Sequence, residues 1–228
     1  MTKTWFITGA SRGFGREWAE AALERGDRVA ATARDPRSLD ALVERFGDRL
    51  LPVALDVTDR EAVFAAVAAA HARFDPILRD QRGGHIVQVS SIGGITAFAS
   101  LGLYNASKWA LEAFTQALAQ EVAVYGVKTT LVEPAAYATD WGGDSAITAT
   151  PMPAYDHVRA ARAARKSAQV PGDPVATRTA ILAVVDAEEP PLRIFFGRGP
   201  LEIAKADYER RIAVWEAWRG VSEAAHGH

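Results

Sequence analysis

A tyrosine and a lysine four residues apart, Tyr104 and Lys108, have the types and the spacing needed for proton transfer. Residues four apart in a helix lie on one face, so the ammonium group of Lys108 is expected near the phenol of Tyr104. A nearby positive charge favours the phenolate and lowers the pKa of the phenol. Tyr104 is therefore a candidate general acid near neutral pH.

Ser91 is a second candidate for chemistry at the same place. It follows the apolar segment His85–Val89, which predicts a short buried strand. A hydroxyl group at the carboxyl end of a strand can donate a hydrogen bond to a substrate oxygen. We expect Ser91 to polarise a carbonyl group.

A glycine-rich turn lies near the amino end, where Thr8–Gly15 follows the strand-like segment Thr4–Thr8 and opens a helix. In this context Gly9, Gly13 and Gly15 let backbone amides and a helix N-terminus approach a pyrophosphate. The alternative is a merely tight turn. The flanking strand and helix, with the downstream tyrosine and lysine, favour dinucleotide binding. Together these residues predict hydride exchange between a nicotinamide and a carbonyl or alcohol.

The choice of dinucleotide depends on the end of the second strand. An acidic residue there would bind the adenosine ribose and repel a 2'-phosphate, but this chain has Ala33 and Arg34. Arg34 and Arg12 can form a charge-assisted clamp on that phosphate, so NADP(H) is favoured over NAD(H). The alternative is two solvated surface arginines, because Asp35 can neutralise Arg34.

Composition limits the possible partners. The 228 residues fit one domain, and the net charge of −2 gives no basic field for nucleic acid or for a membrane surface. Without cysteine there are no disulfides or thiolate metal sites, and the five histidines lack ligand-like spacing except for a pair at the carboxyl terminus. We expect no metal site and a small-molecule substrate.

The location is expected to be cytoplasmic. The first strand begins almost at Met1, which leaves no space for a signal peptide, and no apolar segment approaches the length of a membrane span.

Strand-like and helix-period segments alternate along the chain, which predicts an α/β fold: a Rossmann-like, doubly wound parallel sheet in three α/β/α layers. The expected strands are Thr4–Thr8, Val29–Thr32, Leu50–Leu55, His85–Val89, Lys128–Val132 and Arg193–Phe196. Ser38 and Thr58 are expected to cap helices. The polar stretch Tyr137–Pro174 is expected to be a substrate lid within a single domain, residues 1–228.

Two groups of aromatic residues admit a structural or a binding role. In the lid, Trp141, Met152 and Tyr155 either line an apolar pocket or simply pack down. Near the carboxyl terminus, Tyr208, Ile212 and Trp215 share a helix face and are expected to pack in the core.

The glycine turn, Ser91 and the segment Tyr104-Asn-Ala-Ser-Lys108 resemble the short-chain dehydrogenase/reductase family, from Thr4 to about Thr139. The resemblance implies that Tyr104 is the catalytic acid/base and that Ser91 orients the substrate carbonyl. It implies that Lys108 binds the nicotinamide ribose and lowers the pKa of the tyrosine.

The resemblance also implies a set of cofactor-binding residues: Gly9, Ser11, Arg12, Gly13, Phe14, Gly15, Arg34, Asp56, Val57, Tyr104, Lys108, Pro134 and Thr139. Asp56 can equally be a helix-start residue. The segment Pro134–Thr139 is similar to the family's Pro-Gly-x-x-x-Thr, with alanine in place of glycine. If Ala135 must adopt φ > 0, the cost is on the order of 1 kcal/mol.

The family pattern also predicts a missing unit. After the helix that ends near Phe74, the family has a strand, an Asn-Asn-Ala-Gly loop and a long helix with a catalytic asparagine; here Asp75-Pro76 leads directly into Ile77–Gly84. The gap is roughly 30 to 50 residues, judged from usual element lengths. Asn105, the chain's only asparagine, adjoins Tyr104 and points to another helix face, so it cannot replace the missing one.

The missing unit predicts six strands in place of seven and a helical crossover between Phe74 and His85. The strand Thr4–Thr8 is expected to pair with His85–Val89, because a gap would leave buried backbone groups unpaired at about 1–3 kcal/mol each. The cofactor groove is then expected to be narrow.

The predicted function is an NADP(H)-dependent short-chain oxidoreductase. The alternative is a non-catalytic or impaired dinucleotide-binding protein, a deletion variant that acts as a binding or oligomer partner. A homodimer or homotetramer is possible in either case.

Overall fold

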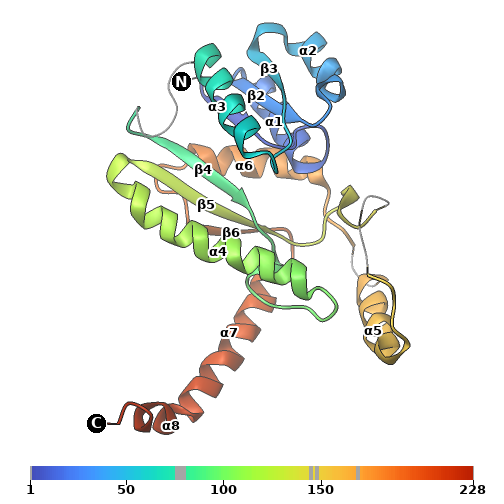
Figure 1. The fold of residues 1–228 in the computed structure, drawn as a ribbon, viewed down its shortest axis with the longest axis vertical. Helices are drawn as coiled ribbons and strands as arrows, with labels where there is room; N and C mark the ends of the chain where they lie inside the picture. Colours follow the sequence, from blue (N-terminus) through green and yellow to red (C-terminus); the bar gives the residue numbers. More distant parts are fainter. Residues whose placement is uncertain (1, 75–80, 144–145, 147–148, 168–169, 228) are drawn as a thin grey trace.

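The computed structural model describes residues 2–74, 81–143, 146, 149–167 and 170–227. It contains two three-stranded parallel sheets, seen as separate groups in Figure 1. The first has the order β1-β2-β3, with β1 (Thr4–Ile7), β2 (Arg28–Ala33) and β3 (Leu50–Ala54). The second has the order β4-β5-β6, with β4 (Gly84–Val89), β5 (Val127–Pro134) and β6 (Arg193–Phe196).

The prediction of six parallel strands is confirmed, but the prediction of one continuous sheet is wrong. Within the described part of the chain, β1 pairs with β2 and β4 pairs with β5, and no ladder joins β1 to β4. The narrow cofactor groove was expected only if β1 paired with β4, so this expectation no longer has support. The crossover predicted between Phe74 and His85 falls mainly on residues 75–80, which lie outside the described residues.

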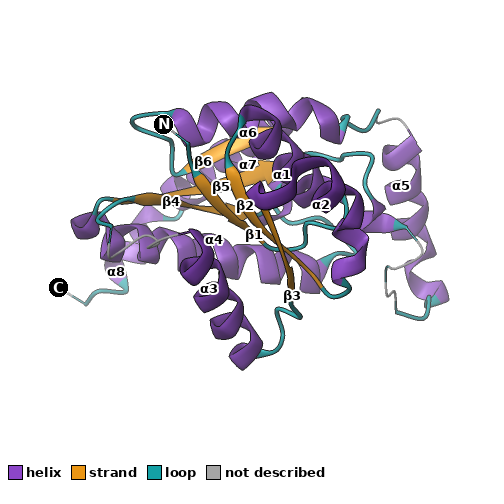
Figure 2. Cartoon of the chain, turned by 90° about the horizontal axis from the view of Figure 1, so that it is seen from above, coloured by secondary structure: helices purple, strands orange, loops and turns teal. Residues whose placement is uncertain are grey.

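Helices cover both faces of the sheets, which confirms the three-layer α/β/α arrangement (Figure 2). One layer holds α1 (Gly13–Arg25), α2 (Asp40–Phe46) and α6 (Thr177–Asp186). The other holds α3 (Arg60–Phe74) behind the first sheet and α4 (Gly102–Val122) behind the second.

One apolar core spans both sheets on the side of α1 and α6. It joins Trp18 of α1, Ile181 of α6, Val29 of β2, and Val132 and Phe196 of the second sheet. Both sheets thus pack against the same pair of helices, whose side chains set the spacing between the sheets. This explains why closure of the β1–β4 gap is not needed to hold the halves together.

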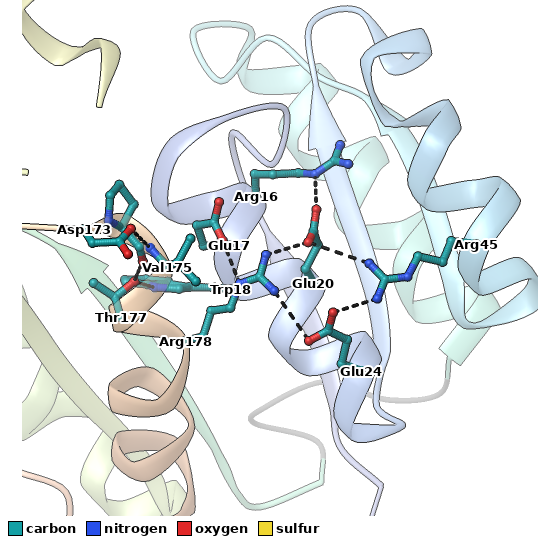
Figure 3. Close-up of polar contacts among 11 residues, drawn as sticks. Arg16, Glu17, Trp18, Glu20, Glu24, Arg45, Asp173, Val175, Thr177 and Arg178 are labelled. Carbon is teal, nitrogen blue, oxygen red and sulfur yellow. Dashed lines mark hydrogen bonds and ion pairs between the residues drawn. The ribbon is translucent and has the colours of Figure 1, made fainter. Parts of the chain in front are cut away.

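Polar contacts between α1 and α6 reinforce this core (Figure 3). Arg178 of α6 forms ion pairs with Glu17 at 2.6 Å, Glu20 at 2.5 Å and Glu24 at 3.5 Å. The indole nitrogen of Trp18 donates to the hydroxyl of Thr177 at 2.9 Å. This last pair is buried, so its loss would leave unpaired polar groups between the two halves.

Two helix starts differ from the prediction by a few residues. Ser38 does not cap α2, whose N-cap residue Leu39 makes no side-chain cap hydrogen bond. Asp35 caps the preceding short helix Pro36–Leu39 by accepting from the backbone nitrogen of Arg37. Asp59, not Thr58, precedes α3 and accepts from the backbone nitrogen of Ala62. Carboxylates are strong helix caps because they also complement the helix dipole.

The stretch predicted to be a lid and the carboxyl-terminal region supply the remaining helices. The lid stretch contains α5 (Asp156–Ser167), and the chain ends with α7 (Pro200–Ala217) and α8 (Arg219–Ala224), which extend away from the sheets in Figure 1. Further short 3-10 helices are Gly47–Arg49, Ile92–Gly94, Ala123–Tyr125, Asp140–Gly142, Pro153–Tyr155 and Pro174–Ala176. In the described ranges, no helix is both long and apolar enough to cross a membrane.

The expected core packing of the α7 aromatic face is wrong. Tyr208 and Ile212 are each 46% exposed and Trp215 is 62% exposed. A shared helix face predicts an amphipathic helix, but it does not say that the body of the protein extends far enough to cover that face.

His85 of β4 is a partly buried base whose ionisation opposes folding. Its Nε2 donates to the hydroxyl of Thr130 at 2.8 Å, because that hydroxyl itself donates to the carbonyl oxygen of Pro191 at 2.7 Å. Burial, with the charges of Lys128 and Lys3, lowers the pKa of His85 from 6.5 to about 4. The folded state therefore holds a neutral imidazole.

We expect this site to contribute to acid instability. As pH falls from 6.5 to about 4, the unfolded chain gains a proton that folded His85 does not, so the free energy of unfolding falls. His85→Gln should flatten that fall by on the order of 1–2 kcal/mol, since the ring is only partly buried. Urea unfolding at several pH values measures this, with exposed His71→Gln as the control. A parental slope in the His85→Gln variant would contradict the assignment.

Candidate active site

The glycine turn has the backbone geometry that a phosphate cradle needs. Gly9 and Gly13 have φ of +67° and +58°, which L side chains rarely adopt, and nothing lies within 4 Å of a side chain added at Gly9. A Cβ at Gly15 would lie 2.4 Å from the carbonyl oxygen of Gly9, so only glycine lets α1 pack against the turn. The N-cap residue Arg12 makes no side-chain cap hydrogen bond. The first backbone N–H groups of α1 are therefore suited to an anion, and the turn fits a pyrophosphate.

The side chain of Phe14, a predicted cofactor-binding residue, faces the protein. Its ring stacks on Trp18 at 5.6 Å between centroids and meets the edge of Tyr137 at 5.0 Å. Only the backbone of Phe14 is thus available to a ligand. Its ring packs between α1 and Tyr137, the first residue of the predicted lid stretch.

The segment that follows β5 contacts both the glycine turn and Tyr104. The methyl carbon of Thr139 lies 3.9 Å from the position of a Cβ on Gly13, and Asp140 forms an ion pair with Arg12. Trp141 meets the ring of Tyr104 edge-on, with 5.0 Å between centroids. Three consecutive residues therefore bring the turn and Tyr104 to one site.

The alanines of this segment cause no backbone strain. Pro134 is buried at the end of β5, and the backbone nitrogen of Ala135 donates to Phe196 at 2.8 Å. Positive φ among described non-glycine residues occurs at Arg82 and Ser100, not at Ala135. The condition under which Ala135 would cost energy is therefore not met.

The residues predicted at the adenosine end lie at the ends of β2 and β3. Arg34 is exposed, and its predicted neutralising partner Asp35 instead pairs with Arg37 at 2.9 Å. Asp56 accepts from the backbone nitrogen of Thr58 at 2.9 Å and from its hydroxyl at 2.8 Å; these bonds, with a smaller effect of Arg34, lower the pKa of Asp56. Val57 is 61% exposed. Arg34 and Arg37 are thus both exposed at this end, where Arg37 pairs with Asp35, while Arg12 pairs with Asp140.

Ser91, Tyr104 and Lys108 come together between the carboxyl end of β4 and the first turns of α4. Ser91 caps a short 3-10 helix by accepting from the backbone nitrogen of Gly93 at 3.0 Å, and it hydrogen-bonds with Tyr104. Lys108 Nζ donates to the carbonyl oxygen of Val89 at 3.0 Å and lies 5.9 Å from the centre of the Tyr104 ring. The predicted grouping of hydroxyl, phenol and ammonium is present.

The expected net lowering of the Tyr104 pKa is not found. Burial raises the pKa of Tyr104, and the hydrogen bond with Ser91 opposes this only in part. Burial also lowers the pKa of Lys108, while Glu112 opposes that change. The phenol accordingly keeps its proton at neutral pH, which is the form required of a proton donor.

Two residues near Tyr104, Gly93 and Asn105, allow its ring to lie close to Ser91. Neither residue was predicted from the sequence to have this role. A Cβ on Gly93 would lie 3.1 Å from Cε1 of Tyr104 and 3.0 Å from Oδ1 of Asn105. The Asn105 amide nitrogen donates to the carbonyl oxygen of Phe98 at 2.9 Å, which holds the loop before α4. The sequence signal for Gly93 is the Gly-Gly pair just after Ser91.

Backbone hydrogen bonds join the two ends of the predicted lid stretch. The backbone nitrogen of Ala138 donates to Gly172 at 2.9 Å, and that of Gly172 donates to Ala136 at 2.9 Å. Of the three candidate pocket residues, Trp141 contacts Tyr104, whereas Met152 and Tyr155 are 60% and 56% exposed. Among the described side chains, no group of three or more histidine, aspartate or glutamate residues is arranged to hold a metal ion.

Comparison with known proteins agrees with this geometry. The family model for short chain dehydrogenases matches residues 3–78 and 75–148. The chain belongs to that family. Its members act on small molecules, and this short-chain dehydrogenase is an NAD(P)-dependent oxidoreductase.

Two relatives cover nearly the whole chain. Oxidoreductase BOA17 of Botryotinia fuckeliana is 38% identical over an alignment of 273 positions, which covers 99% of this chain and 100% of the relative. A short-chain dehydrogenase from Streptomyces avermitilis has a solved structure that superposes with a TM-score of 0.90 at 31% identity, over 99% of both chains.

More distant structures share the fold and hold either dinucleotide. A short chain dehydrogenase from Burkholderia cenocepacia, in complex with NADP, has a TM-score of 0.69 at 22% identity over 95% of this chain and 97% of its own. One from Burkholderia phymatum, in complex with NAD, has a TM-score of 0.69 at 21% identity over 91% and 93%.

Proposed function

We propose that this short-chain dehydrogenase interconverts a carbonyl and an alcohol with NADP(H). The observation that carries the proposal is the grouping of Ser91, Tyr104 and Lys108, linked to the glycine turn by the contacts of Thr139 and Trp141. The nicotinamide, when bound, supplies or accepts the hydride. Gly9, Gly13, Gly15 and the start of α1 would hold the pyrophosphate, and Pro134 to Thr139 would line the nicotinamide.

In the reducing direction the proton comes from Tyr104. Ser91 hydrogen-bonds the carbonyl oxygen of the substrate and holds it near the phenol. Tyr104, protonated at neutral pH because burial raises its pKa, then donates its proton to that oxygen. Lys108 stabilises the phenolate that remains, because its ammonium group lies on the same helix face.

We also propose that the chain lacks one strand and one helix of its family. The family model matches in two parts that meet at residues 75–78, and the alignment with the fungal relative is longer than the chain. The separate three-stranded sheets support the same proposal. The alternative function, dinucleotide binding without efficient catalysis, follows from this loss.

An assay separates the two functions. NADPH consumption is measured against a panel of ketones and aldehydes, with NADPH binding measured in parallel by fluorescence. Turnover of any carbonyl supports the oxidoreductase. Binding without turnover across the panel selects the non-catalytic alternative.

Arg34 should decide the preference between the dinucleotides. We expect NADPH to bind more tightly than NADH, by roughly tenfold or more, because a charge-assisted hydrogen bond to the 2'-phosphate contributes about 1.5–3 kcal/mol. Arg34→Asp should reverse the preference. Titration of both cofactors measures this, and exposed Arg60→Asp on α3 controls for the change in net charge. Equal affinities of the parent for both cofactors would remove the basis of the claim.

A further inference from the structure

Glu133 is an unusual residue for the centre of a parallel sheet. It lies on β5, is 0% exposed, and neither of its carboxylate oxygens accepts a hydrogen bond from an N–H or hydroxyl donor in the described structure. The group within hydrogen-bonding reach is another carboxyl, that of Glu112 on α4. Two carboxyl groups can hydrogen-bond only when one of them carries a proton.

The guanidinium group of Arg193 lies beside both carboxyl groups. Nε of Arg193 on β6 lies 2.9 Å from Oε2 of Glu112 and 3.7 Å from Oε1 of Glu133, and its Nη2 donates to Gln116 at 2.9 Å. Two ionised carboxyl groups beside this arginine would repel each other in a buried site, where the desolvation cost of each charge is high.

The loop after β4 completes the surroundings of the pair. A Cβ on Gly94 would lie 2.7 Å from the hydroxyl of Ser90 and 3.1 Å from Oε1 of Glu112, so Gly94 leaves room for both groups. The Ser90 hydroxyl is buried and has no hydrogen-bond partner among the described residues. Of the described cations, Arg193 on β6 and Lys108 on α4 act on the pair.

Burial makes the protonated form of Glu133 the stable one near neutral pH. Burial and the charge of Glu112 raise the pKa of Glu133 from 4.5 to about 8, and Arg193 opposes this only in part. Like charges that share a site behave in this way, since one group must keep its proton for the other to ionise.

Glu112 also faces the proposed active site. It lies one helical turn after Lys108, on the same face of α4. Burial favours the neutral amine of Lys108, and the negative charge of Glu112 is the effect that opposes this.

We propose that Glu112 and Glu133 share one proton, and that the single negative charge left on the pair keeps Lys108 in its ammonium form beside Tyr104. Glu112 is then a positioning residue that acts through Lys108. The sharing of the proton does not depend on the proposed function, whereas the value of a charged Lys108 rests on it.

Nuclear magnetic resonance with carbon-13 in the lysine side chains measures the titration of Lys108 directly, without turnover. The chain has five lysines, and Lys108→Arg identifies the signal. Glu112→Gln should lower the pH midpoint of Lys108, because it removes the negative charge. Glu133→Gln should lower that midpoint much less than Glu112→Gln does, because below about pH 8 glutamine resembles the protonated acid. Exposed Glu121→Gln on the same helix is the matched control.

A larger drop of the Lys108 midpoint in Glu112→Gln than in Glu133→Gln is the result expected of a shared proton. An equal drop of the Lys108 midpoint in Glu112→Gln and Glu133→Gln would mean that both acids are ionised, and no drop in either would remove the link to Lys108. If Glu112→Gln does not fold, the glutamate carboxyl signals of the parent still test whether Glu112 and Glu133 share a proton. A Glu133 signal that titrates near 8 supports sharing, and one near 4.5 overturns it.

Discussion

Tyr104→Phe should abolish reductase turnover while NADPH binding stays close to that of the parent. The substitution removes one transferable proton and leaves the ring, which packs against Trp141 and over Gly93. Loss of a general acid lowers the rate by about 10²–10⁴-fold. Single-turnover NADPH oxidation and a binding titration on the same preparation measure the two effects separately.

Two further variants make the result specific. Lys108→Ala should weaken both binding and turnover, because Lys108 is proposed to touch the cofactor and to stabilise the phenolate. Tyr125→Phe, at a 40% exposed tyrosine beyond the end of α4, should change neither. Substantial turnover by Tyr104→Phe would mean that another group supplies the proton.

The strands and the local turn chemistry could be predicted because they depend on neighbours in sequence. The predicted strand Arg193–Phe196 is β6, and the other five expected strands agree with the structure to within two residues at each end. The glycine turn has the positive φ angles expected of a phosphate loop. In each case the residue type restricts the backbone over a few positions.

The association of the two sheets could not be predicted in the same way. The cost of open strand edges, taken alone, favours pairing of β1 with β4. The two sheets are also held by the core that Trp18, Ile181 and Phe196 form between residues far apart in sequence, and by the ion pairs of Arg178 with α1. Packing that is shared by distant segments has no periodic signal in a single sequence.

The site shows the same division. The spacing of Tyr104 and Lys108 predicts a shared helix face, and their grouping with Ser91 is present. The ion pair between Arg12 and Asp140 joins residues 128 positions apart, and no local pattern indicates it. The glutamate in the apolar strand Leu131-Val-Glu-Pro134 was a signal that could have been used, because a charged residue at such a position needs a partner.

Restoring the proposed missing unit should raise both stability and turnover. The inserted segment is a strand followed by a helix, taken from the part of the fungal relative that aligns between the two matched regions, and placed between Phe74 and Gln81. The new strand would offer backbone donors and acceptors to the open edges of β1 and β4. Each buried group that gains a partner contributes about 1–3 kcal/mol, so we expect the free energy of unfolding to rise by several kcal/mol.

Turnover should rise for a geometric reason. A strand between β1 and β4 would fix the glycine turn, which follows β1, relative to Ser91, which follows β4. A misplacement of about 1 Å between reacting groups can cost on the order of a hundredfold in rate. Urea unfolding and kcat/KM for NADPH-dependent carbonyl reduction measure the two gains.

A flexible insertion tests whether pairing is the cause. A glycine-serine linker of equal length at the same position adds chain but no strand, and it should leave turnover at the parental level. If the linker and the strand-helix insertion behave alike, the open edges do not limit this protein. The shared core of α1 and α6 would then be sufficient to align β1 with β4.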